Sequence, residues 1–550
     1  MTPDSLTAQS LLNCLIREVA DPVRPAREDG GRYLLLRLPR SGIRLRASLA
    51  RASAGLAPRL DGTVEERCEG RWRPLDWRRL ATLTARELTL ASGSANPEFA
   101  PQVADSHAAA TAILAAAAKD QPASEDRIHR YLASEQALAA GHRFHPAPKA
   151  GRGDPRDWLR YAPEAGARFP LRFLAVRDDL AADAGDVTAL DRLGAPAAPP
   201  GYRTLPAHPW QLRLLRESRW LAEALRAGLV ADLGAGEREV APTSSVRTVY
   251  DPAADVFCKF SLQVRLTNCV RVSAWYELAG SVELTRLLAP ALDDLAARHP
   301  GMAVLTEPGY RTVAAADKRC YQGLAVIVRD GLAARLAPGV TPLLTAALAE
   351  PVTRPSEDLW PPAPVFAWWE AYLRLVVPPV LDLLVTHGVA LEPHMQNVIV
   401  GVDRAGLPAQ VFFRDLEGVK LVRETHVRSL AAMPPGVARG LAYDAGRAWD
   451  RVLYCLLVNH LDQIAAALAD RCPDPLRAEA ELWEMLSETL AKCAADLGGP
   501  PRLRALLDGA PLPAKANLTL RWNRAADRES EYLPLPTPWS PPLPVPWRHE

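Results

Sequence analysis

Lysine is nearly missing from this sequence of 550 residues: seven of its 65 cationic side chains are lysine, and the other 58 are arginine. Arginine replaces lysine wherever a solvated charge suffices, but not where a compact ammonium on a flexible stem must reach one point. The cations are balanced by 64 Asp and Glu, which leaves a formal net charge of +1. This balance excludes a strongly basic nucleic-acid binder and an acidic-tail protein.

Long hydrophobic runs and paired cysteines are also scarce. The longest nearly all-apolar run, residues 108–118, is far shorter than the roughly 20 residues that span a bilayer. The first twenty residues carry no basic stretch followed by an apolar core, as a secretory signal would. The eight cysteines include no C-x-x-C pair, which argues against a disulfide framework or a zinc knuckle. We expect a cytoplasmic protein without membrane insertion and without a nucleic-acid partner.

Length and an apolar content of 48% allow a large core divided into about two to four domains. Strand-like runs alternate with helical runs in the middle of the chain, and long amphipathic helices follow residue 365. The pattern predicts an α+β protein with a mixed or antiparallel sheet in the middle and a largely helical C-terminal part. Composition shifts place boundaries near residues 150 and 350. The proline-rich tail, 534–550, is expected to be extended along the surface or disordered.

The first stretch that carries chemistry is Gly141-His-Arg-Phe-His145-Pro-Ala-Pro-Lys149-Ala-Gly-Arg-Gly153. It gathers two imidazoles, three cationic side chains and three glycines in a loop after a predicted helix, which suits wrapping an anion. An exposed basic loop is the alternative interpretation. A second, smaller island is His208-Pro-Trp-Gln211, which an ordinary turn with a packed tryptophan also explains.

The third stretch combines hydroxyls and cations on two predicted strands. It contains Ser245, Arg247 and Thr248, then Lys259, and then Asn268 and Arg271. A turn between the strands would bring Ser245, Arg247 and Lys259 to one face if the register allows. Such a set forms a plausible phosphate clamp, with a guanidinium fork for geometry and an ammonium as a point charge. Strand-surface charges with capping hydroxyls are the alternative.

The fourth stretch reads Glu392-Pro-His394-Met-Gln396-Asn397 and leads into a predicted hairpin, 397–415, that ends at Asp415. It is similar to the arrangement in kinases, where an Asn and an Asp after a short hairpin hold magnesium on a nucleoside triphosphate. The alternative is a structural role, in which these polar side chains only satisfy each other's hydrogen bonds at the base of the hairpin. The sequence has no GxxxxGK[ST] loop, no GxGxxG after a strand and no GxSxG elbow, so the common phosphate cradles and a serine hydrolase are not supported.

In this order, the four stretches resemble the nonribosomal-peptide-synthetase-independent siderophore (NIS) synthetases of the aerobactin-synthetase type. Each stretch is a weak signal alone, but the ordered set is specific. Lys515-Ala-Asn517 also resembles the family's C-terminal Lys-x-Asn element. One departure is Arg143, where the family commonly has proline, so the shape of that loop is expected to differ.

The resemblance implies an ATP-dependent ligase. It would adenylate a carboxylate of citrate or a citryl derivative and condense it with a polyamine, amino acid or amino alcohol, releasing AMP and pyrophosphate. The implied fold is a cradle with a thumb (1–150), fingers (151–350) and a palm (351–533), and a homodimer is expected. The cofactors would be ATP and Mg²⁺.

The resemblance also implies roles for individual residues, and Glu392 would orient its loop. Catalysis would rest on Lys259, Arg271 and His394, and the acid's carboxylates would meet Asn268, Arg271 and His394. Asn397 and Asp415 would hold the metal. The ATP-binding set would be His145, Lys149, Ser245, Arg247, Thr248, Lys259, Gln396, Asn397 and Asp415.

Two other functions compete with the ligase. The fourth stretch alone would fit a kinase-like phosphotransferase, which releases ADP instead of AMP. A noncatalytic binding subunit that kept the fold is the second alternative, and the intact charged residues of the third and fourth stretches argue against it.

Overall fold

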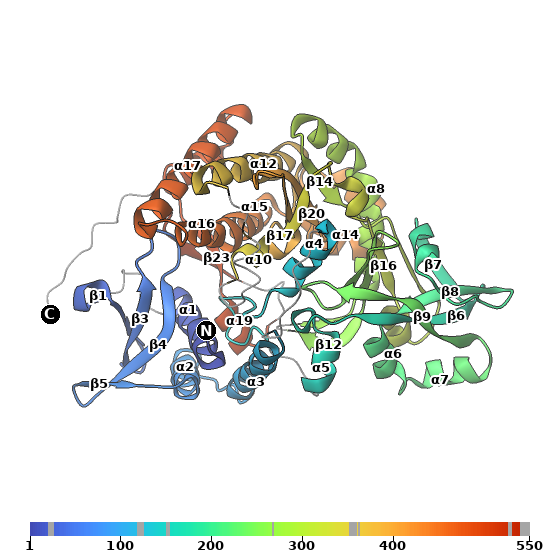
Figure 1. Ribbon diagram of the computed structural model, residues 1–550, viewed down its shortest axis with the longest axis horizontal. Coiled ribbons are helices and arrows are strands. Elements are labelled where there is room, and N and C mark those ends of the chain that lie inside the picture. Colours follow the sequence, from blue (N-terminus) through green and yellow to red (C-terminus); the bar gives the residue numbers. More distant parts are fainter. Residues whose placement is uncertain are drawn as a thin grey trace.

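The structure is a computed structural model that describes residues 1–19, 27–117, 126–149, 155–266, 269–350, 360, 363–525 and 531–539. Figure 1 shows three parts that follow one another along the chain: an N-terminal sheet, a central sheet, and a mainly helical C-terminal part. The predicted combination of helices with antiparallel sheets is confirmed.

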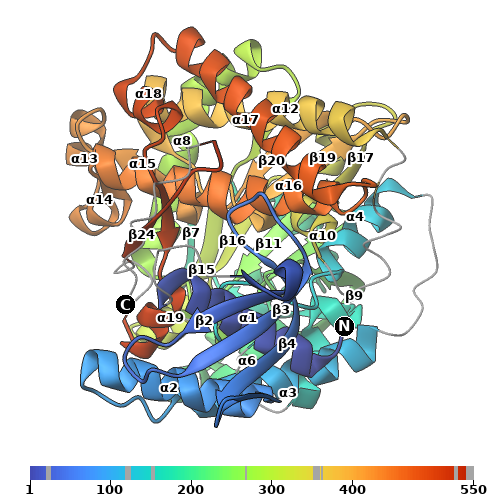
Figure 2. The same cartoon turned by 90° about the vertical axis from the view of Figure 1, so that its left-hand side faces the viewer.

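The N-terminal part is a five-stranded antiparallel sheet packed against three helices (Figure 2). Its helices are α1 (Pro3–Glu18), α2 (Trp77–Ser92) and α3 (Phe99–Ala117), and its strands are β1 (Arg27–Glu28), β2 (Tyr33–Arg37), β3 (Arg44–Arg51), β4 (Arg59–Cys68) and β5 (Arg71–Pro74). The Asp76 side chain begins α2 by accepting a hydrogen bond from the Arg79 amide, as N-cap residues do. The core of this part includes Leu518 and Trp522 of α19 (Asn517–Trp522), so a helix from the C-terminal part of the chain packs into the N-terminal core.

The central sheet has eight strands in the order β7-β15-β16-β11-β10-β9-β6-β8, and every pairing is antiparallel. The bounds are β6 (Phe169–Arg177), β7 (Ala181–Gly185), β8 (Tyr202–Ala207), β9 (Val230–Pro242), β10 (Thr248–Asp251), β11 (Val256–Phe260), β15 (Gly309–Val313) and β16 (Val326–Arg329). All five residues of β11 are buried, as expected for a central strand covered on both faces. A separate hairpin, β12 (Leu262–Leu266) and β13 (Cys269–Arg271), follows it.

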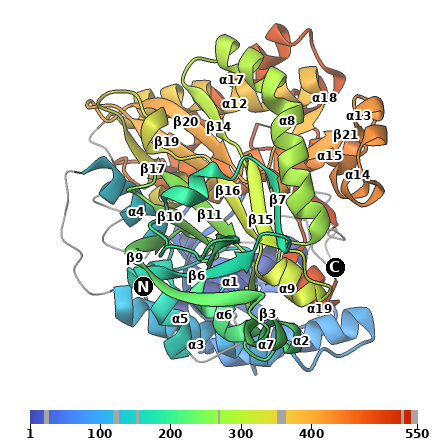
Figure 3. The same ribbon diagram turned by 90° about the vertical axis from the view of Figure 1, so that its right-hand side faces the viewer.

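A second, four-stranded sheet has the order β14-β20-β19-β17. The predicted hairpin is present as β19 (Val398–Val402) and β20 (Pro408–Arg414), and it is joined by β14 (Met302–Leu305) and β17 (Thr341–Leu344). The β14–β20 pairing is parallel, which makes this sheet mixed. Strands from both sides of residue 350 therefore share one sheet. Figure 3 shows β14, β19 and β20 above β11 and β16 of the central sheet.

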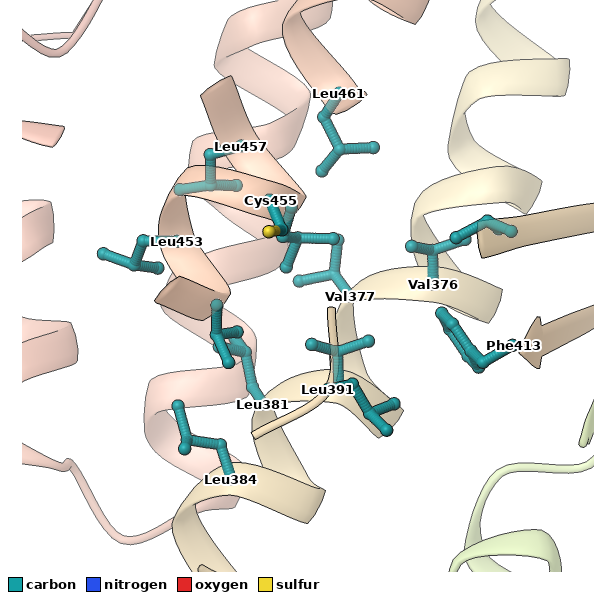
Figure 4. Packing of buried hydrophobic residues seen from close by; sticks show 14 of the residues in the cluster. Val376, Val377, Leu381, Leu384, Leu391, Phe413, Leu453, Cys455, Leu457 and Leu461 are labelled. Carbon is teal, nitrogen blue, oxygen red and sulfur yellow. The ribbon is translucent and has the colours of Figure 1, made fainter. Parts of the chain in front are cut away.

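Helices build the largest core. They are α8 (Trp275–Arg298), α12 (Val365–His387), α15 (Ala445–Leu453), a π-helical segment (Tyr454–Leu461), α16 (Asp462–Ala469) and α17 (Pro475–Asp496). Helix α12 continues through Pro378 and Pro379. Figure 4 shows side chains from α12, such as Leu381, facing Leu453 and Leu457. The run Ala445–Ala469 is long and apolar enough to cross a membrane, but 89% of its most apolar window is buried inside the protein, as in a core helix.

Replacing Leu381 by alanine tests the packing of this core. Leu381 is fully buried, so we expect Leu381→Ala to lower the free energy of unfolding by about 2–5 kcal/mol through lost burial and an unfilled cavity. Urea denaturation followed by tryptophan fluorescence measures the change. Leu476→Ala is the matched control, because Leu476 is 46% exposed, and an equal effect of the two variants would contradict the assignment of Leu381 to the core.

Candidate active site

A buried cluster of opposite charges lies where the central sheet meets the β19–β20 hairpin. Its centre is Lys259 of β11, whose side chain is 2% exposed. Lys259 Nζ donates to Asp415 Oδ1, which follows the last residue of β20, and lies 2.8 Å from Glu417 Oε2 and 3.6 Å from Glu307 Oε1. The lysine that the sequence singled out therefore bridges the two sheets.

Two arginines complete the cluster. Arg247 Nη2 donates to the same Glu417 Oε2 over 2.8 Å, and its Nη1 donates to Ser273 Oγ over 3.1 Å. Arg329 Nη2 donates to Glu307 Oε1 over 2.7 Å and to Asp415 Oδ1 over 3.0 Å. The predicted convergence of Arg247 and Lys259 is present, with one carboxylate between the two cations.

Mutual attraction keeps the cluster ionised. Burial alone would raise the pKa of Asp415, but Lys259, Arg329 and Arg247 outweigh it and hold that pKa far below its ordinary value. Burial is likewise outweighed at Glu417, where Arg247 and Lys259 keep the pKa at about 2. The carboxylates in turn overcome burial at Lys259 and raise its pKa. Three cations thus face three carboxylates across a narrow space.

The backbone is strained on both sides of the cluster. Val246 has φ of 65° and Asp415 has φ of 80°, in the left-handed region that a β-branched residue rarely adopts. A residue stays in such an unfavourable conformation only where the surrounding contacts hold it there, and these residues are found most often at functional sites. At Asp415 this conformation turns the chain from β20 into a short 3-10 helix, Leu416–Gly418, so that Asp415 and Glu417 both reach Lys259.

A second buried ion pair ties the third and fourth stretches together. Glu135 of α4 (Arg127–Gln136) is fully buried and pairs with Arg414 of β20. Its Oε2 also accepts from the Ser244 amide over 2.9 Å, and its Oε1 accepts from the Tyr131 hydroxyl over 2.5 Å. Arg414 Nε and Nη2 donate to the Gln396 carbonyl over 3.0 and 2.7 Å. One ion pair therefore holds the loop before β10 and the loop before β19.

These two loops also contact each other directly. Gln396 Nε2 donates to Ser244 Oγ over 3.2 Å. Ser245 Oγ accepts from the Thr248 amide over 3.2 Å, so the two predicted phosphate-binding hydroxyl residues shape one turn. Asn397 Nδ2 donates to the Glu392 carbonyl over 3.2 Å, which closes the loop around His394.

The 141–149 loop lies against the C-terminal segment Lys515-Ala-Asn517. Asn517 Nδ2 donates to the Phe144 carbonyl over 2.9 Å. Burial, together with the neighbouring cationic groups of His145, Arg17, Lys515 and His394, lowers the pKa of His142 to about 3. The first stretch, the fourth stretch and the Lys515 element therefore converge.

Some predicted site residues have other partners or fall outside the described chain. Lys149 Nζ forms an ion pair with Glu164 and donates to the Leu138 carbonyl over 2.6 Å, so it faces away from the Lys259 cluster. Arg271 pairs with Leu262 in the β12–β13 hairpin. Asn268, a predicted carboxylate ligand, lies outside the described residues.

Several residues of the site were missed by sequence reasoning. Glu135, Glu307 and Arg329 lie in ordinary helix, loop and strand sequence, and nothing in their local pattern marks them. Arg17 of α1 was missed as well: its guanidinium stacks on Phe144 at 3.3 Å, and its two Nη atoms are buried without a hydrogen-bond partner. Among the cluster residues that sequence reasoning did not name, only Glu417 lies next to a recognised stretch. It follows Asp415, the end of the fourth stretch, by two residues.

The predicted metal ligands suit magnesium bound together with a nucleotide. Within the described residues no three His, Cys, Asp or Glu side chains are grouped to hold a metal by themselves. Magnesium at nucleotide sites usually takes only one or two carboxylates, with phosphates and water as its other ligands. Asp415 offers a carboxylate that is ionised and 29% exposed. Asn397 at the base of the same hairpin offers an amide oxygen, so the donor set fits.

Replacing Glu135 by glutamine tests the ion pair that joins the loops. The amide removes the charge that compensates buried Arg414, so we expect Glu135→Gln to destabilise the protein by about 3–5 kcal/mol. Thermal denaturation measures the loss. Glu488→Gln, at an exposed position on α17, serves as the control, and an unchanged melting temperature in Glu135→Gln would contradict this role.

Glu350 makes the stability of the 141–149 region depend on pH. Its Oε1 accepts from the Ala140 amide over 3.1 Å, and burial raises its pKa to about 7, above the roughly 4.3 of an unfolded chain. Between about pH 4.3 and 7, Glu350 therefore binds more protons in the folded state than in the unfolded chain. Its contribution to the free energy of unfolding falls as the pH rises through this range. We expect Glu350→Gln to flatten that part of the curve of melting temperature against pH. An unaltered curve would contradict the assignment.

Comparisons with known proteins agree with the geometry. Residues 130–350 match the "IucA / IucC family", and residues 367–530 match the "Ferric iron reductase FhuF-like transporter" family. The chain is 28% identical to the rhizobactin siderophore biosynthesis protein RhbC of Rhizobium meliloti, with 97% of each chain covered. It is 30% identical to the L-2,3-diaminopropanoate–citrate ligase of Staphylococcus aureus, with 66% of each covered.

Solved structures show the same fold. ATP-bound aerobactin synthetase IucA from Klebsiella pneumoniae superposes with a TM-score of 0.83 at 24% identity, covering 97% of this chain and 99% of that one. The petrobactin biosynthesis protein AsbB of Bacillus anthracis gives a TM-score of 0.77 at 20% identity, covering 98% and 94%. The ordered stretches, the convergence of the third and fourth around Lys259 and these matches together lead to one conclusion: the chain belongs to the IucA/IucC family of NIS synthetases.

Proposed function

We propose that this protein is an ATP-dependent ligase of siderophore biosynthesis. It activates a carboxylate of citrate or a citryl derivative as an acyl-adenylate and condenses it with an amine or hydroxyl, releasing AMP and pyrophosphate. The observation that carries the proposal is the buried placement of Arg247 and Lys259 beside Asp415 and Glu417. The named relatives support it, since they include citrate ligases for diaminopropanoate and spermidine.

The chemistry requires preorganised positive charge. When a carboxylate oxygen attacks the α-phosphate, negative charge grows on the phosphorus oxygens and on the departing pyrophosphate. Cations already fixed in a water-poor site stabilise that charge without reorganising, which is the largest single contribution in many enzymes. Lys259 and Arg247 are assigned to the phosphates, and Ser245 and Thr248 shape the turn beside them. Magnesium, held by Asp415 and Asn397, would neutralise phosphate charge when bound.

The carboxylates of the acid substrate are assigned to His394, Arg271 and Asn268. His145, in the 141–149 loop, and Gln396, in the loop before β19, are assigned to the nucleotide. Lys149 is also assigned to the phosphates. To reach them, its ammonium must leave its ion pair with Glu164 and pair with the nucleotide instead. This exchange would couple the position of the 141–149 loop to ATP binding.

The proposal also assigns the three regions of the chain. The thumb, fingers and palm correspond to residues 1–150, 151–350 and 351–533, with ATP between fingers and palm, where Lys259 meets Asp415. A homodimer and a cytoplasmic location remain predictions. A kinase-like phosphotransferase is not favoured, because the relatives with named activities are ligases and synthetases.

Pyrophosphate release tests the proposed reaction. Protein supplied with ATP, Mg²⁺, citrate and hydroxylamine should release pyrophosphate and AMP and form a hydroxamate, whereas a kinase would release ADP. We expect Lys259→Ala and Arg271→Ala to lower turnover about 100-fold or more, because each removes charge that stabilises the transition state.

The matched control is Lys318→Ala, since Lys318 is exposed at the start of α9 (Lys318–Gly323). Circular dichroism checks that each variant folds. Full turnover in folded Lys259→Ala would remove Lys259 from the site. Absence of pyrophosphate with citrate and with a panel of other carboxylic acids would overturn the ligase proposal.

A further inference from the structure

A second charged group lies beside the Lys259 cluster. Its centre is Lys420 of β21 (Lys420–Val422), which is half-buried. Lys420 Nζ donates to the Glu417 backbone carbonyl over 3.1 Å. It also lies 5.9 Å from the ring centre of Tyr443, in β22 (Ala442–Tyr443), which pairs with β21. Glu417 thus separates Lys420 from the phosphate-binding cations by one residue.

The surroundings of Lys420 come from four further elements. Glu392 in the loop before β19 forms a 2.9 Å ion pair with Arg451 of α15. Glu277 lies in the first turn of α8, where its Oε2 accepts from the Ala274 amide over 2.7 Å. Glu392, Glu277 and Glu417 are close enough to act on the charge of Lys420, as is Arg451. Three carboxylates and one arginine therefore act electrostatically on the ammonium of Lys420.

These surroundings leave Lys420 able to change its protonation state near neutral pH. Burial lowers the pKa of Lys420 to about 8, with Arg451 acting in the same direction and Glu392, Glu417 and Glu277 opposing it. Lys259, in contrast, is held fully charged by its carboxylates. The site thus contains two lysines with different capacities: one is a permanent cation, and the other is a group that can take up a proton.

We propose that Lys420 is the proton acceptor for an amine nucleophile in the second half of the reaction. This inference rests on the proposed ligase function and assigns to it a residue and a substrate class, a basic alkyl amine. Glu277 and Glu392 would attract the cationic part of such a substrate into the space beside Lys420.

The proton balance of the step is as follows. The neutral amine nitrogen forms a bond to the acyl carbon of the adenylate, and the nitrogen becomes cationic and acidic. Lys420 Nζ, in its neutral form, takes that proton. The bond from the acyl carbon to the AMP oxygen breaks, AMP leaves with the electron pair, and the ammonium of Lys420 returns its proton to solvent. The products are the amide, AMP and one proton.

Comparing two nucleophiles in the same protein tests the assignment. Hydroxylamine is weakly basic and mostly uncharged at neutral pH, so its adduct loses a proton to water readily. Alkyl amines such as L-2,3-diaminopropanoate, spermidine and L-lysine depend more on an acceptor. We expect Lys420→Met and Lys420→Arg to lower the rate of amide formation about 100-fold or more. Hydroxamate and pyrophosphate formation should stay near the wild-type rate.

Each control addresses one other explanation. Lys420→Arg keeps the charge and the position over Tyr443 but cannot accept a proton at neutral pH, so restored amide formation in this variant would overturn the proposal. An equal fall in hydroxamate and amide would indicate a structural role and would also overturn it. Lys492→Met, at an exposed position on α17, should behave as wild type in both assays.

The pH dependence adds a readout that a structural role would not move. Amide formation rises with pH in every variant as the amine itself loses its proton; the wild type should show an additional rise in the ratio of amide to hydroxamate through about pH 8, and this additional rise should be missing in Lys420→Arg. Wild-type protein that forms hydroxamate but no amide with any of the three amines would refute the amine-transfer role. Wild-type protein that forms no hydroxamate would refute the adenylation itself, which distinguishes the two failures.

Discussion

The arrangement of the site depends on the buried pair of Glu135 and Arg414. Both side chains lie in a low-dielectric interior, where an ion pair is stable only when its remaining donors and acceptors are also satisfied. Arg414 meets this condition by bonding to the Gln396 carbonyl and the Tyr131 hydroxyl, and Glu135 by accepting the Ser244 amide. Removing one partner would therefore release the loops on both sides together. Segments more than a hundred residues apart in the chain are positioned by this one requirement.

The site lies at the junction of two sheets because that is where strands end. Lys259 and Arg329 belong to neighbouring strands, β11 and β16, whereas Asp415 follows β20 of the other sheet. A carboxylate at a strand end can turn toward the neighbouring sheet only if its backbone leaves the extended region, and Asp415 does so at positive φ. The cost of this strain is offset by the three cations that surround its carboxylate.

Local periodicity predicted much of the fold. The buried strand β11, the β19–β20 hairpin and the helices α12 and α17 follow from alternation, turn residues and apolar spacing. Val246, expected in a strand, instead lies before β10 at positive φ, because the loop is held by Glu135 from a distant helix. Among the long helices expected after residue 365, α15 begins at Ala445 and runs into a π-helical segment, which apolar spacing alone does not reveal.

The candidate site was predictable only in part, for a physical reason. Lys259, Arg247 and Asp415 stood out because their residue types and order carry chemical meaning. Their partners Glu135, Glu307 and Arg329 are defined by contacts across the fold, and no local pattern encodes such contacts. The scarcity of lysine was informative for predicting the site only at positions where we propose that arginine cannot replace lysine, namely Lys259 and Lys420.

The charge balance of the Lys259 cluster has a consequence for selectivity. Arg247, Lys259 and Arg329 are matched by Glu307, Asp415 and Glu417, so without substrates the cluster has no net charge. A simple anion such as phosphate or sulfate would have to compete with carboxylates that are already in place, and it would gain little by entering. Only a ligand that brings its own counter-cation can replace this internal salt without leaving a charge uncompensated. Under the proposed function, a nucleotide and its metal would enter this cluster as such a neutral pair, whereas a free anion would leave a charge uncompensated.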